Sequence, residues 1–134
     1  MAAVRGRAAQ ASEPPADDLL PADPLAFEAW VADRLRAHGW DARPTPAGHD
    51  QGVDVIARKG GVSVGLQCKL YSGAVGNRAV QEVIAGIGFH GLGRGAVLTN
   101  AAFTRSAVDL ARSTGVVLMT HHDLNDPDRL LLGP

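Results

Sequence analysis

Two runs rich in β-branched and apolar residues, separated by Gly60 and Gly61, constrain the fold of this chain more than any other feature. The runs cover residues 53–58 and 62–70 and alternate in the period of two that is typical of strands. Two adjacent glycines between such runs indicate a tight β-hairpin, because both central positions of the favoured turn need a positive φ. The sequence therefore predicts two antiparallel neighbours joined at this turn.

Apolar spacing predicts the remaining elements on both sides of this hairpin. The hairpin is preceded by a helix over 25–38 and a short edge strand within 40–48. It is followed by a helix over 77–91, a buried strand over 95–100, a helix over 104–115 with Thr104 as its N-cap, and a buried strand over 116–120. Strands that alternate with helices at this spacing imply right-handed crossovers and parallel pairing. We therefore expect an α/β fold with a mixed sheet.

The length and composition allow one folded domain. The chain has 134 residues, of which 46% are hydrophobic, which is enough for one core. Residues 1–24 are rich in Ala, Pro and Asp without apolar periodicity, so we expect a disordered tail there and a folded domain over 25–134.

The charge and the cysteine count limit the class of protein. The formal net charge is -1, so no overall basic field attracts a polyanion, and a nucleic-acid partner depends on where the charges lie. Cys68 is the sole cysteine, which excludes an internal disulfide and favours a cytoplasmic protein. No apolar run reaches the roughly 18 residues that a membrane span needs, so no membrane partner is expected.

Polar residues meet at the open end of the predicted hairpin. Asp54 lies six residues before Gly60 and Gln67 lies six residues after Gly61, so the two should face each other across the strands. Lys69 joins them from two positions further on. Alternation also predicts that Val53 and Val55 point to one face and Asp54 to the other.

These residue types suit metal-assisted phosphodiester hydrolysis. Magnesium prefers oxygen ligands from carboxylates, amides and backbone carbonyls, which Asp54, the Gln67 side chain and the Cys68 carbonyl supply. Lys69 is cationic and would instead orient water or offset charge on a phosphate. An Asp and a Lys on adjacent strands more often form a cross-strand ion pair, so the residue types alone leave both interpretations open.

A family resemblance favours the first interpretation. The stretch GHDQGVDVIARKGGVSVGLQCKLYSGAVGNRAVQEVIAG resembles the catalytic domain of Mrr-type restriction endonucleases, a branch of the restriction-endonuclease-like (PD-(D/E)xK) superfamily in which Gln-x-Lys replaces the usual acid-x-Lys. FEAW before it, and AVLTNAAFT and GVVLM after it, follow in the order of the family, over about residues 25 to 124.

The resemblance implies an α/β/α sandwich with a central mixed sheet and magnesium-dependent cleavage of DNA, with manganese expected to substitute. By residue, it implies that Asp54 binds the metal, that Gln67 replaces the second acid, that Lys69 is catalytic, and that Glu28 on the first helix lies near the metal. Typical members carry a separate DNA-reading domain for which this chain has no room. A homodimer or a separate DNA-recognition partner is therefore expected.

Two other functions fit the same sequence. One is a structure-selective nuclease that resembles Holliday-junction resolvases, which also act as compact single domains. The other is a nucleic-acid-binding or assembly module with a degenerate site, which the neutral Gln67 and the near-zero charge keep open.

Several further residues are candidates for the site. The segment after the hairpin offers polar side chains where a DNA backbone would pass, and these candidates are Tyr71, Ser72, Asn77, Arg78 and Gln81. Asn77 is alternatively the N-cap of the next helix.

A second group has mainly structural interpretations. Asp50 and His49 fit a turn better than a metal site, Glu82 is more simply an exposed helix carboxylate than a site residue, and the adjacent His121 and His122 are expected at the surface.

Overall fold

The computed structural model describes residues 20–46 and 52–133. Within them a five-stranded sheet has the order β1-β2-β3-β5-β7, and a separate two-stranded sheet pairs β4 with β6. The strands are β1 (Asp41–Pro44), β2 (Val55–Lys59), β3 (Val62–Lys69), β4 (Ala74–Val75), β5 (Arg94–Thr99), β6 (Ala102–Phe103) and β7 (Val117–Thr120). The helices are α1 (Pro24–Ala37), α2 (Asn77–His90), α3 (Arg105–Thr114), the 3-10 helix η3 (His121–Asn125) and α4 (Pro127–Leu131).

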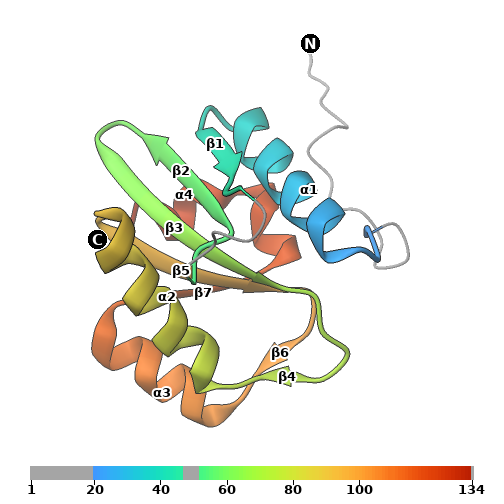
Figure 1. The fold of residues 1–134 in the computed structure, drawn as a ribbon, viewed down its shortest axis with the longest axis vertical. Helices are drawn as coiled ribbons and strands as arrows, with labels where there is room; N and C mark the ends of the chain where they lie inside the picture. The colour runs from blue at the N-terminus through green and yellow to red at the C-terminus, as the bar shows by residue number, and fades with distance from the viewer. Residues whose placement is uncertain (1–19, 47–51, 134) are drawn as a thin grey trace.

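Helices cover both faces of the large sheet (Figure 1). On one face α1, η3 and α4 enclose a core around Phe27, Leu35 and Leu66. On the other face α2 and α3 pack on a second core around Val83 and Val97. Two buried layers around one sheet confirm the predicted α/β/α sandwich.

The hairpin forms where the sequence predicts it. Gly60 and Gly61 have φ of 56° and 83° at the turn, and β2 pairs antiparallel with β3 in the register Val55 to Leu66. The edge strand β1 pairs antiparallel with β2. The crossovers through α2 and α3 make β3, β5 and β7 parallel neighbours, as the alternation of strands and helices predicted.

The helix starts follow local capping chemistry, with one correction. Asp23 accepts a hydrogen bond from Ala26 N at the start of α1, and Thr104 accepts one from Ala107 N at the start of α3, as predicted. The N-cap of α2 is Gly76, without a side-chain cap. The prediction that Asn77 caps this helix is therefore wrong, because Asn77 already has helical geometry in the first turn.

Two further predictions are corrected by the structure. His121 is buried, with 2% of its surface exposed, because the 3-10 helix turns its ring into the molecule, whereas His122 is exposed. The small sheet β4–β6 was not predicted from the sequence, since two-residue strands leave no periodic pattern. It lies beside the main sheet and leads into the first turns of α2 and α3 (Figure 1).

The predicted boundary of the tail at residue 24 remains a prediction. Leu20 packs against the core on the α1 side, so contacts with the domain begin a few residues earlier. No helix in the described ranges is long and apolar enough to span a membrane.

Candidate active site

Asp54 occupies a break in strand geometry immediately before β2. Its backbone N–H donates to Leu66 O at 2.8 Å, and its carboxylate accepts the Cys68 N–H at 2.8 Å. Val53 packs in the core beneath α2 while Val55 packs in the core beneath α1. The prediction that Val53 and Val55 share a face is therefore wrong, because the chain twists at Asp54 and aims its carboxylate along the end of β3.

Gln67 lies beside Asp54 with only 5% of its surface exposed. Its Nε2 donates to Gly52 O at 3.2 Å, and since a carbonyl only accepts, this bond orients the amide with Oε1 pointing away. Oε1 is buried and has no hydrogen-bond partner among the described residues. A buried acceptor left without a partner costs about 1–3 kcal/mol, so this oxygen is available to a cation or a donor.

Lys69 ends β3 with a partly buried side chain. Its Nζ lies 3.7 Å from Glu82 Oε1 and 5.9 Å from the centre of the Tyr71 ring. Glu82 on α2 therefore does approach the site, which the sequence left as the weaker interpretation. The cross-strand pairing of Lys69 with Asp54, which the residue types left open, stays a prediction.

A buried threonine fixes the backbone of Lys69. Thr99 lies opposite Lys69 on β5, and its hydroxyl donates to Lys69 O at 2.7 Å and accepts from Ala101 N at 3.1 Å. Sequence analysis missed this residue, since Thr99 reads as an ordinary member of a buried strand.

Burial and nearby negative charges change the pKa of the Cys68 thiol. Burial first, and then the negative charges of Asp54 and Glu28, raise the pKa of the Cys68 thiol well above its usual range. Both carboxylates therefore lie close enough to Cys68 to act on it, Asp54 from the start of β2 and Glu28 from α1. That Glu28 lies near a bound metal stays a prediction.

The donors at this end of the hairpin are mixed oxygen groups. Among residues 20–46 and 52–133, no three His, Cys, Asp or Glu side chains form a group that could hold a metal ion. A site here would combine the carboxylates of Asp54 and Glu28 with the free amide oxygen of Gln67 and a backbone carbonyl. Such a set fits magnesium, which accepts few protein carboxylates and keeps several waters.

Gly52 allows the loop before Asp54 to lie against α2. A Cβ at this position would come within 2.1 Å of Glu82 O, and the residue has φ of 83°. Only glycine fits both conditions. The same residue supplies the carbonyl that orients Gln67. The signal in the sequence was the Gly that precedes Asp54 by two positions, although the pattern alone does not say what the glycine touches.

The remaining candidates surround this end of β3. Tyr71 is 44% exposed and its N–H donates to Asn100 Oδ1 at 2.8 Å. Asn77 donates to Ser106 Oγ at 2.6 Å and accepts from Gln81 Nε2 at 2.9 Å, so it ties α2 to α3. Ser72, Arg78 and Gln81 are exposed, and their contact with substrate stays a prediction. His49 and Asp50 lie outside the described residues.

Comparison with known proteins identifies a family. A family model described as a restriction endonuclease, Mrr_cat, matches residues 19–126. No curated protein gives a match.

Solved structures share the fold at low sequence identity. The modification-dependent restriction endonuclease AspBHI superimposes with a TM-score of 0.64 at 23% identity, over 96% of this chain and 39% of that one. The MspJI restriction endonuclease, solved in complex with a 27-mer oligonucleotide, gives a TM-score of 0.59 at 20% identity, over 98% of this chain and 36% of that one. The protein of unknown function AF1548 gives a TM-score of 0.62 at 20% identity, over 78% of this chain and 60% of that one. The chain thus spans about a third to three fifths of these structures.

Proposed function

Because the chain belongs to the Mrr_cat restriction endonuclease family, whose model matches residues 19–126, we propose that it is a magnesium-dependent endonuclease that hydrolyses DNA phosphodiester bonds. One observation carries the proposal. The buried carboxylate of Asp54, the unpartnered amide oxygen of Gln67 and the ammonium group of Lys69 meet at one end of one hairpin.

The metal would be held by four oxygen donors: the carboxylates of Asp54 and Glu28, the side-chain oxygen of Gln67 and the carbonyl of Cys68. Two carboxylates compensate for the neutral Gln67 where relatives of this fold carry an acid. A bound divalent ion would offset negative charge on the phosphate and activate water towards attack. Manganese prefers similar oxygen ligands, so we expect it to substitute.

The role of Lys69 follows from its position. Its Nζ is partly buried and can donate hydrogen bonds to a phosphate oxygen or to the attacking water. Glu82 Oε1, at 3.7 Å, restrains Nζ, and Thr99 fixes the backbone beneath it. Asp54 in turn is held by the Cys68 N–H. These contacts preorganise the site before substrate binds.

In the overall reaction, the oxygen of a water molecule bonds to phosphorus while one bond from phosphorus to a deoxyribose oxygen breaks. One proton of the water ends on the departing sugar oxygen. The products are a phosphate monoester and an alcohol, and no redox partner is needed. Lys69 stabilises the charge that develops on the phosphate between these two states.

Partner and biological role are part of the same proposal. Membership of a restriction endonuclease family supports action on DNA in a restriction system, and the structural neighbour MspJI was solved with an oligonucleotide. The chain spans less than two thirds of each neighbour. We also propose that a second copy of the chain or a separate partner takes part in DNA recognition, as the family resemblance implies.

The test is nicking of supercoiled plasmid, methylated and unmethylated, with magnesium, manganese or chelator. We expect metal-dependent nicking that Lys69→Ala reduces by a factor of about 100 or more, as for loss of a preorganised charge at a developing anion. Lys59→Ala is the matched control, because Lys59 pairs with Asp128 at the opposite end of β2 and its loss changes the same charge away from the site. Equal nicking by parent and Lys69→Ala would refute the proposal.

A further inference from the structure

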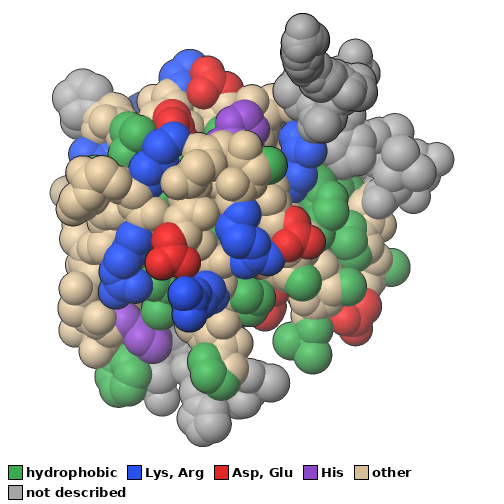
Figure 2. All heavy atoms as spheres, turned by 90° about the horizontal axis from the view of Figure 1, so that it is seen from above, with side chains coloured by type: hydrophobic (Ala, Val, Ile, Leu, Met, Phe, Trp, Pro, Cys, Tyr) green, Lys and Arg blue, Asp and Glu red, His purple; other side chains and the backbone are tan. Residues whose placement is uncertain are grey.

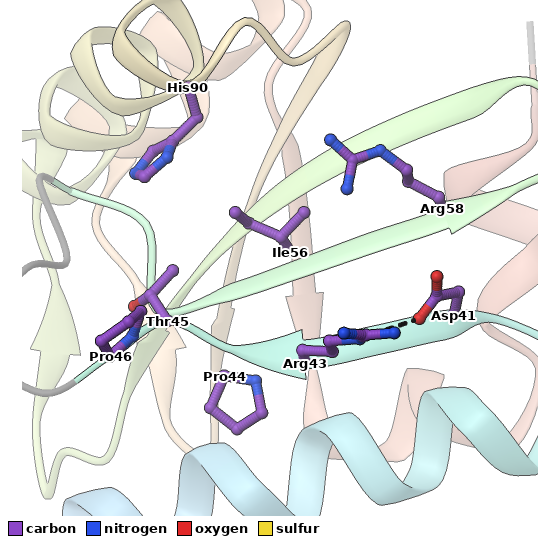
Figure 3. Close-up of a pocket in the computed structure, with 8 residues that line it drawn as sticks. All are labelled: Asp41, Arg43, Pro44, Thr45, Pro46, Ile56, Arg58 and His90. Carbon is purple, nitrogen blue, oxygen red and sulfur yellow. Dashed lines mark hydrogen bonds and ion pairs between the residues drawn. The ribbon is translucent and has the colours of Figure 1, made fainter.

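A cavity of about 530 Å³ lies along the β1–β2 edge of the sheet, outside the candidate active site. It is lined by Asp41 and Arg43 on β1, Ile56 and Arg58 on β2, His90 at the end of α2, Thr45 and the neighbouring prolines (Figure 3). The sheet face is open here because α2 packs on β3 and β5 and does not extend over β1. The cavity is therefore a product of the fold and not of a single loop.

The cationic groups of the cavity are available to an anion. Arg43 Nε lies 3.3 Å from Asp41 Oδ1, but these side chains are 81% and 64% exposed, and exposed pairs of this kind contribute little. Arg58 is exposed and forms no ion pair with another of the described residues. His90 Nε2 is buried and has no hydrogen-bond partner in the described ranges. Its ring extends from α2 towards Thr45 (Figure 3).

Hydrogen bonds connect one end of the cavity to the backbone that carries Asp54. Thr45, which forms one end of the cavity, donates through its N–H to Asp54 O at 2.8 Å and through its hydroxyl to Val53 O at 2.9 Å. From Asp54 the strand leads to Arg58, four residues on, which is about 13 Å at the usual rise per residue. Arg58 faces Asp41 and Ile56 faces Arg43 in the strand register, so both arginines border one surface.

We propose that this cavity binds a backbone phosphate of the DNA substrate, away from the cleaved bond, through the guanidinium groups of Arg43 and Arg58. Ile56 and the prolines supply an apolar wall for the adjoining deoxyribose. This inference rests on the proposed function, and it makes the cavity the part of the chain that positions the duplex relative to Lys69.

Charge placement explains how a chain of net charge -1 would hold DNA. On the face drawn in Figure 2, Lys and Arg side chains are interspersed with Asp and Glu and form no large patch of one sign. A local pair of arginines bordering a cavity therefore matters more than the overall field, since backbone contacts fix register on the duplex without reading its sequence.

The test is binding of a fluorescently labelled duplex, measured by anisotropy in chelator over a range of salt concentrations. We expect Arg58→Gln to weaken binding roughly tenfold for every duplex sequence and to reduce the slope of log affinity against log salt by about 0.9, the value for one lost phosphate contact. Arg43→Gln combined with Arg58→Gln should reduce the slope by about twice that amount. Arg112→Gln is the matched control, because Arg112 is exposed on α3, over the opposite part of the sheet.

The outcomes separate this inference from the proposed function. Metal-dependent nicking by the parent, together with unchanged affinity and salt slope in the double variant, would overturn the inference and leave the nuclease in place. A parent that neither nicks plasmid nor binds duplex would overturn both. If Arg112→Gln lost as much affinity as Arg58→Gln, the inference about the cavity would also be overturned, since the effect would then be that of net charge.

Discussion

Replacing Gly52 by alanine should disturb both the stability and the site, and Gly61→Ala provides a closely matched comparison. Both glycines have φ of 83°. An L-residue with this backbone costs about 1–2 kcal/mol, so this part of the penalty is common to the two variants. They differ in space, because the added Cβ of Gly61→Ala meets nothing within 4 Å, whereas that of Gly52→Ala lies 2.1 Å from Glu82 O.

The contact with Glu82 is a backbone contact within α2, so it cannot be relieved by a side-chain rotation. The loop and the helix must separate by about 1 Å, and overpacking of this kind typically costs about 1–3 kcal/mol. We therefore expect Gly61→Ala to lower the free energy of unfolding by about 1–2 kcal/mol and Gly52→Ala to lower it by about 2–5 kcal/mol.

The assay is equilibrium unfolding in urea, with nicking measured at a temperature where both variants are folded. Movement of Gly52 lengthens its hydrogen bond to Gln67 Nε2 and displaces Asp54, so Gly52→Ala should also lose activity while Gly61→Ala keeps it. Equal destabilisation by the two substitutions would show that Gly52 does not hold the loop against α2.

Three further predictions address the charges. Gln67→Glu should lower the magnesium concentration needed for half-maximal nicking, because it adds a charged ligand. The same substitution should reduce stability by about 1–3 kcal/mol, because Gly52 O loses its hydrogen-bond donor. An unchanged magnesium requirement would argue against Gln67 as a ligand. Alkylation of Cys68 at pH 8 should be slower than that of a small free thiol, since the pKa of Cys68 is raised by burial and then by Asp54 and Glu28. Glu28→Gln should accelerate the alkylation. Equal alkylation rates in the parent and in Glu28→Gln would place Glu28 away from the site. Burial raises the pKa of Asp128, but hydrogen bonds from Lys59 and Trp40 and the charge of Lys59 outweigh burial and lower the pKa below its ordinary value. This carboxylate therefore stabilises the fold above about pH 4, and the benefit disappears as pH falls through the lowered pKa. In urea unfolding, the difference between parent and Asp128→Asn should shrink as pH falls from about 4 through the lowered pKa, and a constant difference would contradict the assignment.

The architecture was accessible from the sequence because its signals are local. The glycine pair at residues 60 and 61 fixed the hairpin, and counting outwards from it correctly placed Asp54 opposite Gln67, as the register Val55 to Leu66 shows. Thr104 was identifiable as an N-cap because its side chain bonds within the same turn.

The details of the site were less accessible because they arise from tertiary contacts. Period-two alternation placed Val53 with Val55, but the twist at Asp54 puts them in different cores. The approach of Glu82 to Lys69 depends on how α2 packs over β3, and the buried position of His121 depends on the turn of η3. None of these follows from spacing along the chain.

The central claim of this account is that Asp54 and Gln67 at the hairpin end hold a divalent ion. Calorimetric titration of manganese into the parent protein and into Asp54→Asn tests it without reference to activity. We expect binding by the parent that is lost or at least tenfold weaker in Asp54→Asn, since a carboxylate ligand becomes a neutral amide. Equal binding by the two proteins, or no binding by either, would contradict the claim.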